Sequence, residues 1–283
     1  MLNGKFASIE KSAPECRQDA FESSDCMIKA TAQDIDRSLD MEERSWWDLW
    51  NTSYRAKDEL DATPTELFAH VAAVVEHATK GKPGRILEVA CGTGVLSRKL
   101  NFTSYQGLDI SSAAIDIAQK KMNEPGLGSV SNRTYEVADF HNWTPLSDFV
   151  DTVLCVDAMH SFRDQPSVAR KISGMLQSGG LFIVATINPF VYNRIRRVGG
   201  VRLENGPVSH WLSRRELHGL IRQAGLSIER SYTIMPRGNM GWLRIVNSSR
   251  LNEALGPRFG SMFRRVKEWS GLGQYRVVIA RKS

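Results

Sequence analysis

The part of the chain that most constrains its fold runs from Ile86 to Leu96. An apolar run there gives way to a loop of small residues, and leucines at helical spacing, Leu96 and Leu100, follow. Gly92 and Gly94 lack a Cβ atom, so the backbone can turn sharply and a ligand can lie against it. This order predicts a buried strand, a tight turn and the start of a helix.

Two acids accompany this loop. Glu88 comes just before it, and Asp109 follows 21 residues later at the end of a second apolar segment, Tyr105–Asp109. A dinucleotide fingerprint needs a third glycine, which would fall at Ser97, and its pyrophosphate would meet the charge of Glu88. The pattern therefore favours a nucleoside ligand with a ribose at one end and a positive charge at the other.

The stretch from Glu88 to Gly94, taken with Asp109, resembles the class I methyltransferases that use S-adenosyl-L-methionine (SAM). Their first motif reads acid-x-Gly-x-Gly-x-Gly. Ala90 takes the place of the first glycine, which costs little if its φ angle is negative. The resemblance implies SAM as cofactor, held by Glu88, Ala90, Gly92, Gly94, Asp109, Ile110, Asp139, Phe140 and Val156. In that family the acid corresponding to Asp139 meets the adenine amino group, and the residue beside it packs the ring.

Apolar segments alternate with helical patterns along the rest of the chain. The expected later strands are Tyr135–Phe140, Phe149–Asp157, Leu181–Ile187, Leu226–Met235 and Gln274–Ala280. A helix is expected to end in Met175–Gly180, with a glycine as its C-cap. The alternation predicts an α/β fold, a doubly wound seven-stranded Rossmann-like methyltransferase sheet with helical cap additions. Ligands of such folds bind outside the carboxyl ends of the strands.

The chain divides into three parts by composition. Residues 1–40 are polar and predict a flexible extension. Residues 41–61 predict a lid helix, because aromatic side chains follow one helical face; they are Trp46, Trp47, Trp50 and Tyr54. The alternative is a docking helix whose aromatics are simply core. Residues 62–283 predict the methyltransferase domain, with a helix started by Thr63–Glu66 and cap insertions at about 188–212 and 236–272.

Histidine supplies the candidate base. His160 follows the fourth strand, near where the transferred methyl group should point, and imidazole titrates close to neutral pH. The alternative is a histidine that only packs beneath the cofactor. Asp157 is expected to orient a base or to bind the methionyl end of the cofactor. Trp47, Trp50, Tyr54, Arg196 and His210 are the expected acceptor and lid residues.

Charge is unevenly distributed over the chain. Residues 188–283 contain sixteen arginines, two lysines, five glutamates and no aspartate, a net charge of +13 in a chain whose total is +6. Arginine suits two-point contact with carboxylate or phosphate, which favours an anionic acceptor; an acidic carrier protein or a membrane surface would also fit. The competing interpretation is a solvated face that balances the acidic N-terminal part.

Neither metal nor membrane chemistry is indicated. The cysteines Cys16, Cys26, Cys91 and Cys155 have no C-x-x-C spacing, so free thiols in a cytoplasmic protein are expected and no metal is. No signal peptide and no membrane span is evident. The sequence leaves the oligomeric state undetermined.

The acceptor is expected to be a small molecule. O-methylation of a phenolic, sugar or carboxylate-bearing metabolite is favoured, since three short motifs resemble ubiquinone-pathway O-methyltransferases: Trp46-Trp47-Asp48, Thr186-Ile187-Asn188, and Arg215-Glu216-Leu217 with Ala224-Gly225-Leu226. An N- or C-methyltransferase is the first alternative. An RNA methyltransferase is disfavoured because Asp157–His160 lacks the Asn/Asp-Pro-Pro-aromatic pattern of N6-adenine enzymes and no RNA-binding module is evident. A non-catalytic SAM-binding protein is the last alternative.

Overall fold

The structure is a computed structural model that describes residues 41, 43–49, 62–122, 132–145, 150–191, 210–234, 262, 266, 271 and 273–283. Contacts divide the chain into residues 1–38 and 39–283, and every described residue belongs to the second unit. The predicted extension over residues 1–40, most of both predicted cap insertions, and Trp50, Tyr54 and Arg196 lie outside the described residues.

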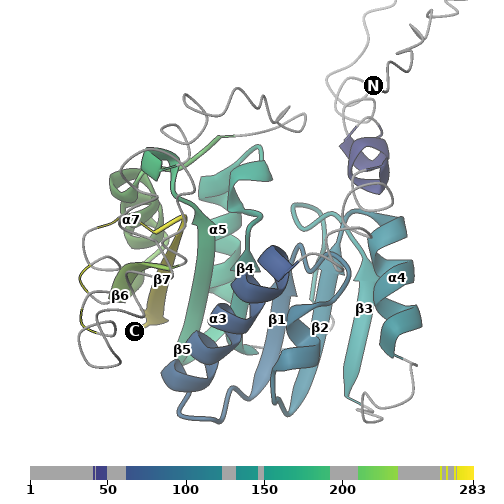
Figure 1. The fold of residues 1–283 in the computed structure, drawn as a ribbon, viewed down its shortest axis with the longest axis horizontal. Helices are drawn as coiled ribbons and strands as arrows, with labels where there is room; N and C mark the ends of the chain where they lie inside the picture. The colour runs from purple at the N-terminus through teal and green to yellow at the C-terminus, as the bar shows by residue number, and fades with distance from the viewer. Residues whose placement is uncertain are drawn as a thin grey trace, which may run out of the picture. The chain divides into compact units, whose positions relative to one another are not determined.

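A seven-stranded mixed sheet forms the centre of the fold (Figure 1). Its strands are β1 (Arg85–Val89), β2 (Ser104–Asp109), β3 (Arg133–Val137), β4 (Val150–Val156), β5 (Leu176–Ile187), β6 (Leu226–Ile234) and β7 (Tyr275–Lys282). They lie in the order β3-β2-β1-β4-β5-β7-β6. All neighbours are parallel except β7, which runs antiparallel to β5 and β6. The predicted doubly wound α/β fold is confirmed.

Helices cover both faces of this sheet. Their bounds are α3 (Ala62–Ala78), α4 (Ser112–Met122), α5 (Gln165–Met175) and α7 (Arg214–Gln223), with the short 3₁₀ helices η2 (Leu96–Lys99) and η3 (Met159–Ser161). Apolar residues of α3 and α4, such as Val71 and Ile115, pack in one core cluster. Those of α5 and α7, such as Ile172 and Leu217, pack in the other. Figure 1 shows α3 in front of the sheet and α5 behind it.

Helix α7 begins with a reciprocal cap between Ser213 and Glu216. The Ser213 hydroxyl accepts a hydrogen bond from the Glu216 amide, and the Glu216 carboxylate accepts one from the Ser213 amide. This reciprocal cap satisfies two amides that the first helical turn leaves without partners. Since Leu217 and Ile221 are fully buried, the cap and the apolar face together fix α7 on the sheet.

Three predicted element ends are wrong. Helix α5 ends at Met175, and its C-cap is Leu176 rather than a glycine; the extended backbone of Leu176 (φ −73°, ψ 139°) leads directly into β5. Strand β5 thus begins five residues before the predicted Leu181. The sequence did not indicate this start because Gln177, Ser178 and Gly179 are exposed and lack the apolar pattern of a buried strand. The helix expected from Leu96 is one 3₁₀ turn, since Leu100 is extended (φ −113°).

The third strand is also shorter at its end than predicted. It closes at Val137, so Asp139 lies in the following loop rather than at the last strand position. The cause is local, because the Asp139 carboxylate accepts a hydrogen bond from the His141 amide and turns the chain.

No helix within the described ranges is both long enough and apolar enough to cross a lipid bilayer.

Candidate active site

The glycine loop leaves β1 in a left-handed backbone conformation. Ala90, Gly92 and Gly94 have φ angles of 57°, 54° and 71°. The condition under which alanine would cost little here, a negative φ, is therefore not met. The Cβ of Ala90 meets the carbonyl oxygen in this conformation, at a cost of about 1–2 kcal/mol. The loop holds Ala90 there because the Cys91 amide donates to the Leu108 carbonyl of β2, 2.9 Å away.

A buried polar network lies beneath the loop. A Cβ on Gly94 would lie 2.5 Å from the Tyr135 hydroxyl, so only glycine fits there. That hydroxyl lies 2.5 Å from Ser97 Oγ, which donates to the Gly94 carbonyl at 2.8 Å. The strand residue Tyr135 thus sets the height of the loop above the sheet.

Glu88 belongs to the same buried layer. Its side chain is almost fully buried and accepts a hydrogen bond from the Tyr105 hydroxyl. Burial first, and then the charge of Glu88, raises the pKa of Tyr105 well above its ordinary value. Tyr105 therefore keeps its proton and remains a donor, and the negative charge of Glu88 lies under the loop.

Asp109 joins the ends of β1 and β2. One carboxylate oxygen accepts from the Gly92 amide at 2.7 Å, and the other accepts from the Ser111 amide at 2.9 Å. A carboxylate has about four acceptor positions, so this type of group can accept hydrogen bonds from hydroxyls as well as from amides. A pair of adjacent hydroxyls is what a ribose presents.

The loop after β3 is fixed by a lysine from α5. Lys171 Nζ donates to the carbonyl groups of Phe140, His141 and Trp143. The Phe140 ring lies in the core, 6.3 Å from the rings of both Trp143 and Phe162. The Asp139 carboxylate accepts from the His141 amide and the Asn142 side chain.

A helix over residues 43–49 contacts the loops after two strands. The Asp48 carboxylate accepts from Ser111 Oγ at 2.7 Å and from the Ala113 amide at 3.1 Å, so it caps α4. Glu43 forms an ion pair of 2.8 Å with Arg163. In the sheet β1 lies between β2 and β4, so these contacts fall on either side of the strand that carries the glycine loop.

His160 lies in η3, just beyond β4. Its ring stacks on Trp211, with centroids 4.7 Å apart and planes 14° from parallel. Nδ1 is buried and has no hydrogen-bond partner. Burial lowers the pKa of His160 to about 4, so the ring is uncharged at neutral pH. The segment is tied down from both sides, since Gln165 Nε2 donates to the Met159 and His210 carbonyls.

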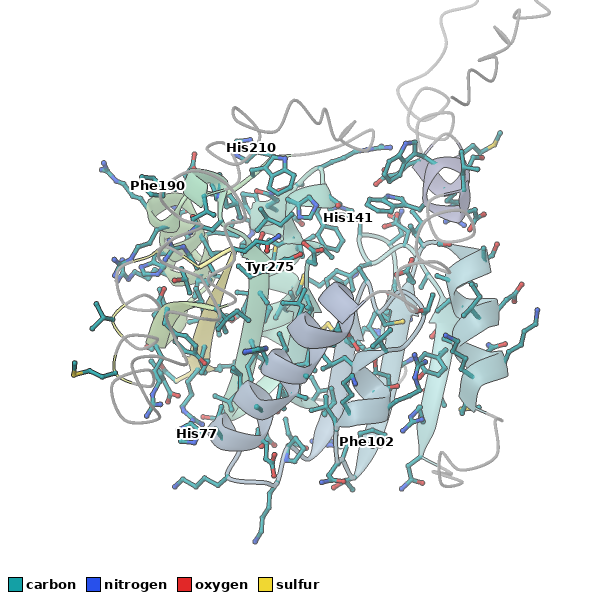
Figure 2. All side chains as sticks on the ribbon, in the orientation of Figure 1. His77, Phe102, His141, Phe190, His210 and Tyr275 are labelled. Atoms are coloured by element: carbon teal, nitrogen blue, oxygen red, sulfur yellow. The ribbon has the colours of Figure 1, made fainter. Side chains whose placement is uncertain are left out.

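The other predicted residues differ in burial. Val156 is buried at the end of β4, and Asp157 follows it with a φ of 54°. Ile110 is half-buried between Asp109 and Ser111. The His210 side chain is 67% exposed and lies 4.0 Å from Glu216, at the rim of the site. His141 and His210 lie toward the carboxyl edge of the parallel strands, and His77 and Phe102 toward the opposite edge (Figure 2).

Several residues of the site were not singled out from the sequence. They are Asp48, Glu43, Arg163, Trp211 and Lys171. A signal existed for two of them, because Asp48 completes the Trp-Trp-Asp motif and Trp211 adjoins His210. The other three act through contacts between distant segments, such as Glu43 with Arg163, and leave no local pattern.

The residues present fit SAM as cofactor. Gly92 and Gly94 add no side chain to the loop that leaves β1, and the Asp109 carboxylate is a hydrogen-bond acceptor of the kind that a ribose diol needs. Cys91 and Cys155 are buried, and neither forms a disulfide. Within the described ranges, no three His, Cys, Asp or Glu side chains are grouped so that they could hold a metal ion.

Comparison with known proteins identifies the family. The family described as "Methyltransferase domain" matches residues 59–231. The structure of magnesium protoporphyrin IX methyltransferase from Synechocystis PCC 6803 with bound SAH superposes with a TM-score of 0.58 at 16% identity. The superposition covers 88% of this chain and 100% of the Synechocystis chain. At this identity the likeness concerns the fold alone.

Curated relatives are more similar in sequence. A probable phthiotriol/phenolphthiotriol dimycocerosates methyltransferase 2 of Mycobacterium ulcerans (strain Agy99) is 32% identical over 139 residues, 47% of this chain and 50% of that protein. A ubiquinone biosynthesis O-methyltransferase of Paracidovorax citrulli (strain AAC00-1) is 26% identical over 145 residues, 50% of this chain and 57% of that protein. The chain thus spans about half the length of the curated relatives it matches. With the matched domain and the strand order, these findings show that the chain belongs to the class I SAM-dependent methyltransferases.

Proposed function

We propose that this methyltransferase transfers the methyl group of SAM to a hydroxyl oxygen of a small-molecule acceptor, with His160 as the base. One observation carries the proposal: a buried, uncharged imidazole lies just beyond β4 with an unpartnered nitrogen. The names of two kinds of relative describe methyltransferases of small molecules, and one of the two is named as an O-methyltransferase. The phenolic, sugar or carboxylate-bearing acceptors inferred from the sequence remain the candidates.

The cofactor site follows from the loop and its two acids. When bound, SAM supplies an electrophilic methyl group on a sulfonium. Asp109 would accept hydrogen bonds from the ribose hydroxyls, while Glu88, buried under the loop, would attract the positive end of the cofactor through space. Ile110, Asp139, Phe140 and Val156 would enclose the adenine and the methionyl chain, as the family resemblance implies.

The transfer needs a base and a dry site. As the acceptor oxygen bonds to the methyl carbon, the carbon–sulfur bond breaks and the hydroxyl proton passes to His160. A hydroxyl becomes far more acidic as its oxygen forms this bond, so a base of low pKa can accept the proton late in the step. Trp211 holds the imidazole plane by stacking on it. The apolar surface of this indole ring suits an aromatic or otherwise apolar acceptor.

The helix over residues 43–49 would serve as a lid. Asp48 is five positions after Glu43, which in a helix corresponds to a rise of about 7.5 Å. The distance from β2 to β4 is two strand spacings, about 10 Å. The two acids can therefore anchor the helix on both sides of β1. Trp46 and Trp47 are half-buried and pack edge to face at 4.6 Å. Trp50, Tyr54 and Arg196, proposed as further lid and acceptor residues, lie outside the described residues.

Two variants separate the roles of base and cofactor ligand. His160→Ala is expected to lower kcat by about 10²–10⁴-fold while calorimetry finds SAM affinity within a factor of about three. Asp109→Ala is expected to weaken SAM binding at least about tenfold, because hydrogen bonds to a charged group are lost. Equal losses of turnover and of SAM affinity in His160→Ala would make this residue structural and refute the proposed base.

A further inference from the structure

The second residue of β7 carries a buried charge without a counter-charge. Arg276 is 8% exposed, and its Nε atom is buried without a hydrogen-bond partner. Across the described part of the chain, no carboxylate forms an ion pair with its guanidinium. A buried guanidinium loses its hydration and is costly unless an anion replaces the lost water.

The surroundings of Arg276 add more positive charge. Burial first, and then the charge of Arg214 on α7, lowers the pKa of Arg276. His218 on the same helix has its pKa lowered by burial and by the charges of Arg214, Arg222 and Arg276. The positive charges of Arg214 and Arg276 therefore repel one another, and a bound anion would relieve this repulsion.

A second unsatisfied group lies next to Arg276 across the sheet. Thr186 of β5 is paired with Arg276 in the antiparallel register, so both side chains lie on the same face. The Thr186 hydroxyl is buried and also has no hydrogen-bond partner. A guanidinium and a hydroxyl side by side supply the donors that carboxylate and phosphate oxygens accept. Two orphaned polar groups on paired strands indicate one shared ligand.

This pair lies at the edge of the sheet where the acceptor is expected. Thr186 is the next-to-last residue of β5, and the Asp157 amide beyond β4 donates to the carbonyl of its neighbour Ala185. Tyr275, adjacent to Arg276, is placed toward the same edge as His141 and His210 in Figure 2. Strand β7 is two positions from β4, which corresponds to about 10 Å.

We propose that Arg276 and Thr186 bind a carboxylate or phosphate group of the methyl acceptor, about 10 Å from the hydroxyl that His160 deprotonates. This inference rests on the proposed function, since it places the anion at the far end of the same acceptor. It defines the acceptor as a molecule whose reacting hydroxyl and anionic group are separated by at least the length of an aromatic ring.

The test measures anion binding to the full chain by calorimetry and thermal unfolding. The probes are benzoate and inorganic phosphate, which distinguish the two anion classes, with benzamide and chloride at equal ionic strength as controls. Arg276→Met removes the charge. Arg281→Gln, on the same strand but paired with Glu229 on the exposed surface, is the matched control. SAM affinity is measured for every variant.

The expected result is that benzoate or phosphate raises the unfolding temperature of the wild type and of Arg281→Gln. In Arg276→Met that shift is lost, and the anion-free variant unfolds at a higher temperature than the anion-free wild type, because an uncompensated charge has left the interior. An equal anion shift in Arg276→Met, an equal loss in Arg281→Gln, or no shift in the wild type would overturn the inference.

A second variant covers the case in which Arg276→Met does not fold. Thr186→Val keeps the shape of the side chain and removes only the hydroxyl, so anion binding is expected to weaken about tenfold; unchanged affinity would overturn the inference. Failure of the proposed function shows separately. If the wild type did not bind SAM, the proposed function would be refuted. If it bound SAM but neither benzoate nor phosphate, only the proposed anion site at Arg276 and Thr186 would be refuted.

Discussion

At the scale of single residues, Ala90 is the point where the loop stores strain. Its φ of 57° is one that glycine adopts freely and alanine does not. We expect Ala90→Gly to raise the free energy of unfolding by about 0.5–1 kcal/mol, since relief of the strain exceeds the extra entropy of glycine in the unfolded chain.

Urea unfolding measures this effect, and Ala69→Gly is the matched control. Ala69 is exposed in the interior of α3, where glycine costs about 1 kcal/mol. The two variants should therefore change stability in opposite directions. A loss of stability in Ala90→Gly similar to that in the control would contradict the assignment of strain to Ala90.

His160 gives stability a defined dependence on pH. Its pKa in the folded protein is about 4, below the ordinary value of 6.5, so between these values the unfolded chain binds a proton that the folded chain excludes. The contribution of His160 to the free energy of unfolding is thus retained above pH 6.5. It falls by about 3 kcal/mol as the pH drops toward 4.

We expect His160→Gln to lack this part of the acid destabilisation. Urea unfolding of both proteins at pH 7, 5.5 and 4 should show the wild type losing about 3 kcal/mol more than the variant over the range. Parallel pH curves would mean that the imidazole is not excluded from protonation by burial.

At the scale of elements, the helix over residues 43–49 joins two loops that carry site residues. Asp48 both caps α4 and contacts Ser111, whose amide donates to Asp109. We expect Asp48→Ala to raise the dissociation rate of SAH about five- to tenfold by releasing the lid, and to cost about 1 kcal/mol of stability through the lost cap.

Asp116→Ala is the matched control for Asp48→Ala. Asp116 is exposed on α4, and removing its carboxylate leaves the cap formed by Asp48 intact. Stopped-flow measurement of SAH release distinguishes the two roles of Asp48. An unchanged release rate with the same loss of stability would make Asp48 only a helix cap.

The elements also show what could be predicted from the sequence and what could not. The strand and loop order and the acids near the strand ends follow from local patterns, and the sequence predicted them. The stacking of His160 on Trp211 joins residues 51 positions apart, and the cap by Asp48 joins segments 63 or more apart. Such contacts depend on strand register and loop path, which no local pattern specifies. The sign of φ at Ala90 could not be predicted for the same reason, since contact with β2 decides it.

At the scale of the whole molecule, the proposed cofactor site and the proposed acceptor site occupy different parts of the sheet. Strands β1 to β3 carry the glycine loop and the acids proposed to bind SAM, whereas β7 carries the buried Arg276, beside Thr186 of β5. The excess of arginine after residue 187 is therefore not only a solvated surface, because Arg276 lies in the interior. This division explains how the donor can be identified from one motif while the acceptor depends on residues far along the chain.

The most direct test of the proposed function follows the methyl group itself. The full chain is incubated with ¹³C-methyl SAM and a fractionated cell extract, and NMR locates the labelled carbon. We expect the label on oxygen, as a methoxy group of a small anionic molecule, with labelling abolished in Asp109→Ala. Label found on nitrogen, on carbon or in the RNA fraction would contradict O-methylation of a small molecule.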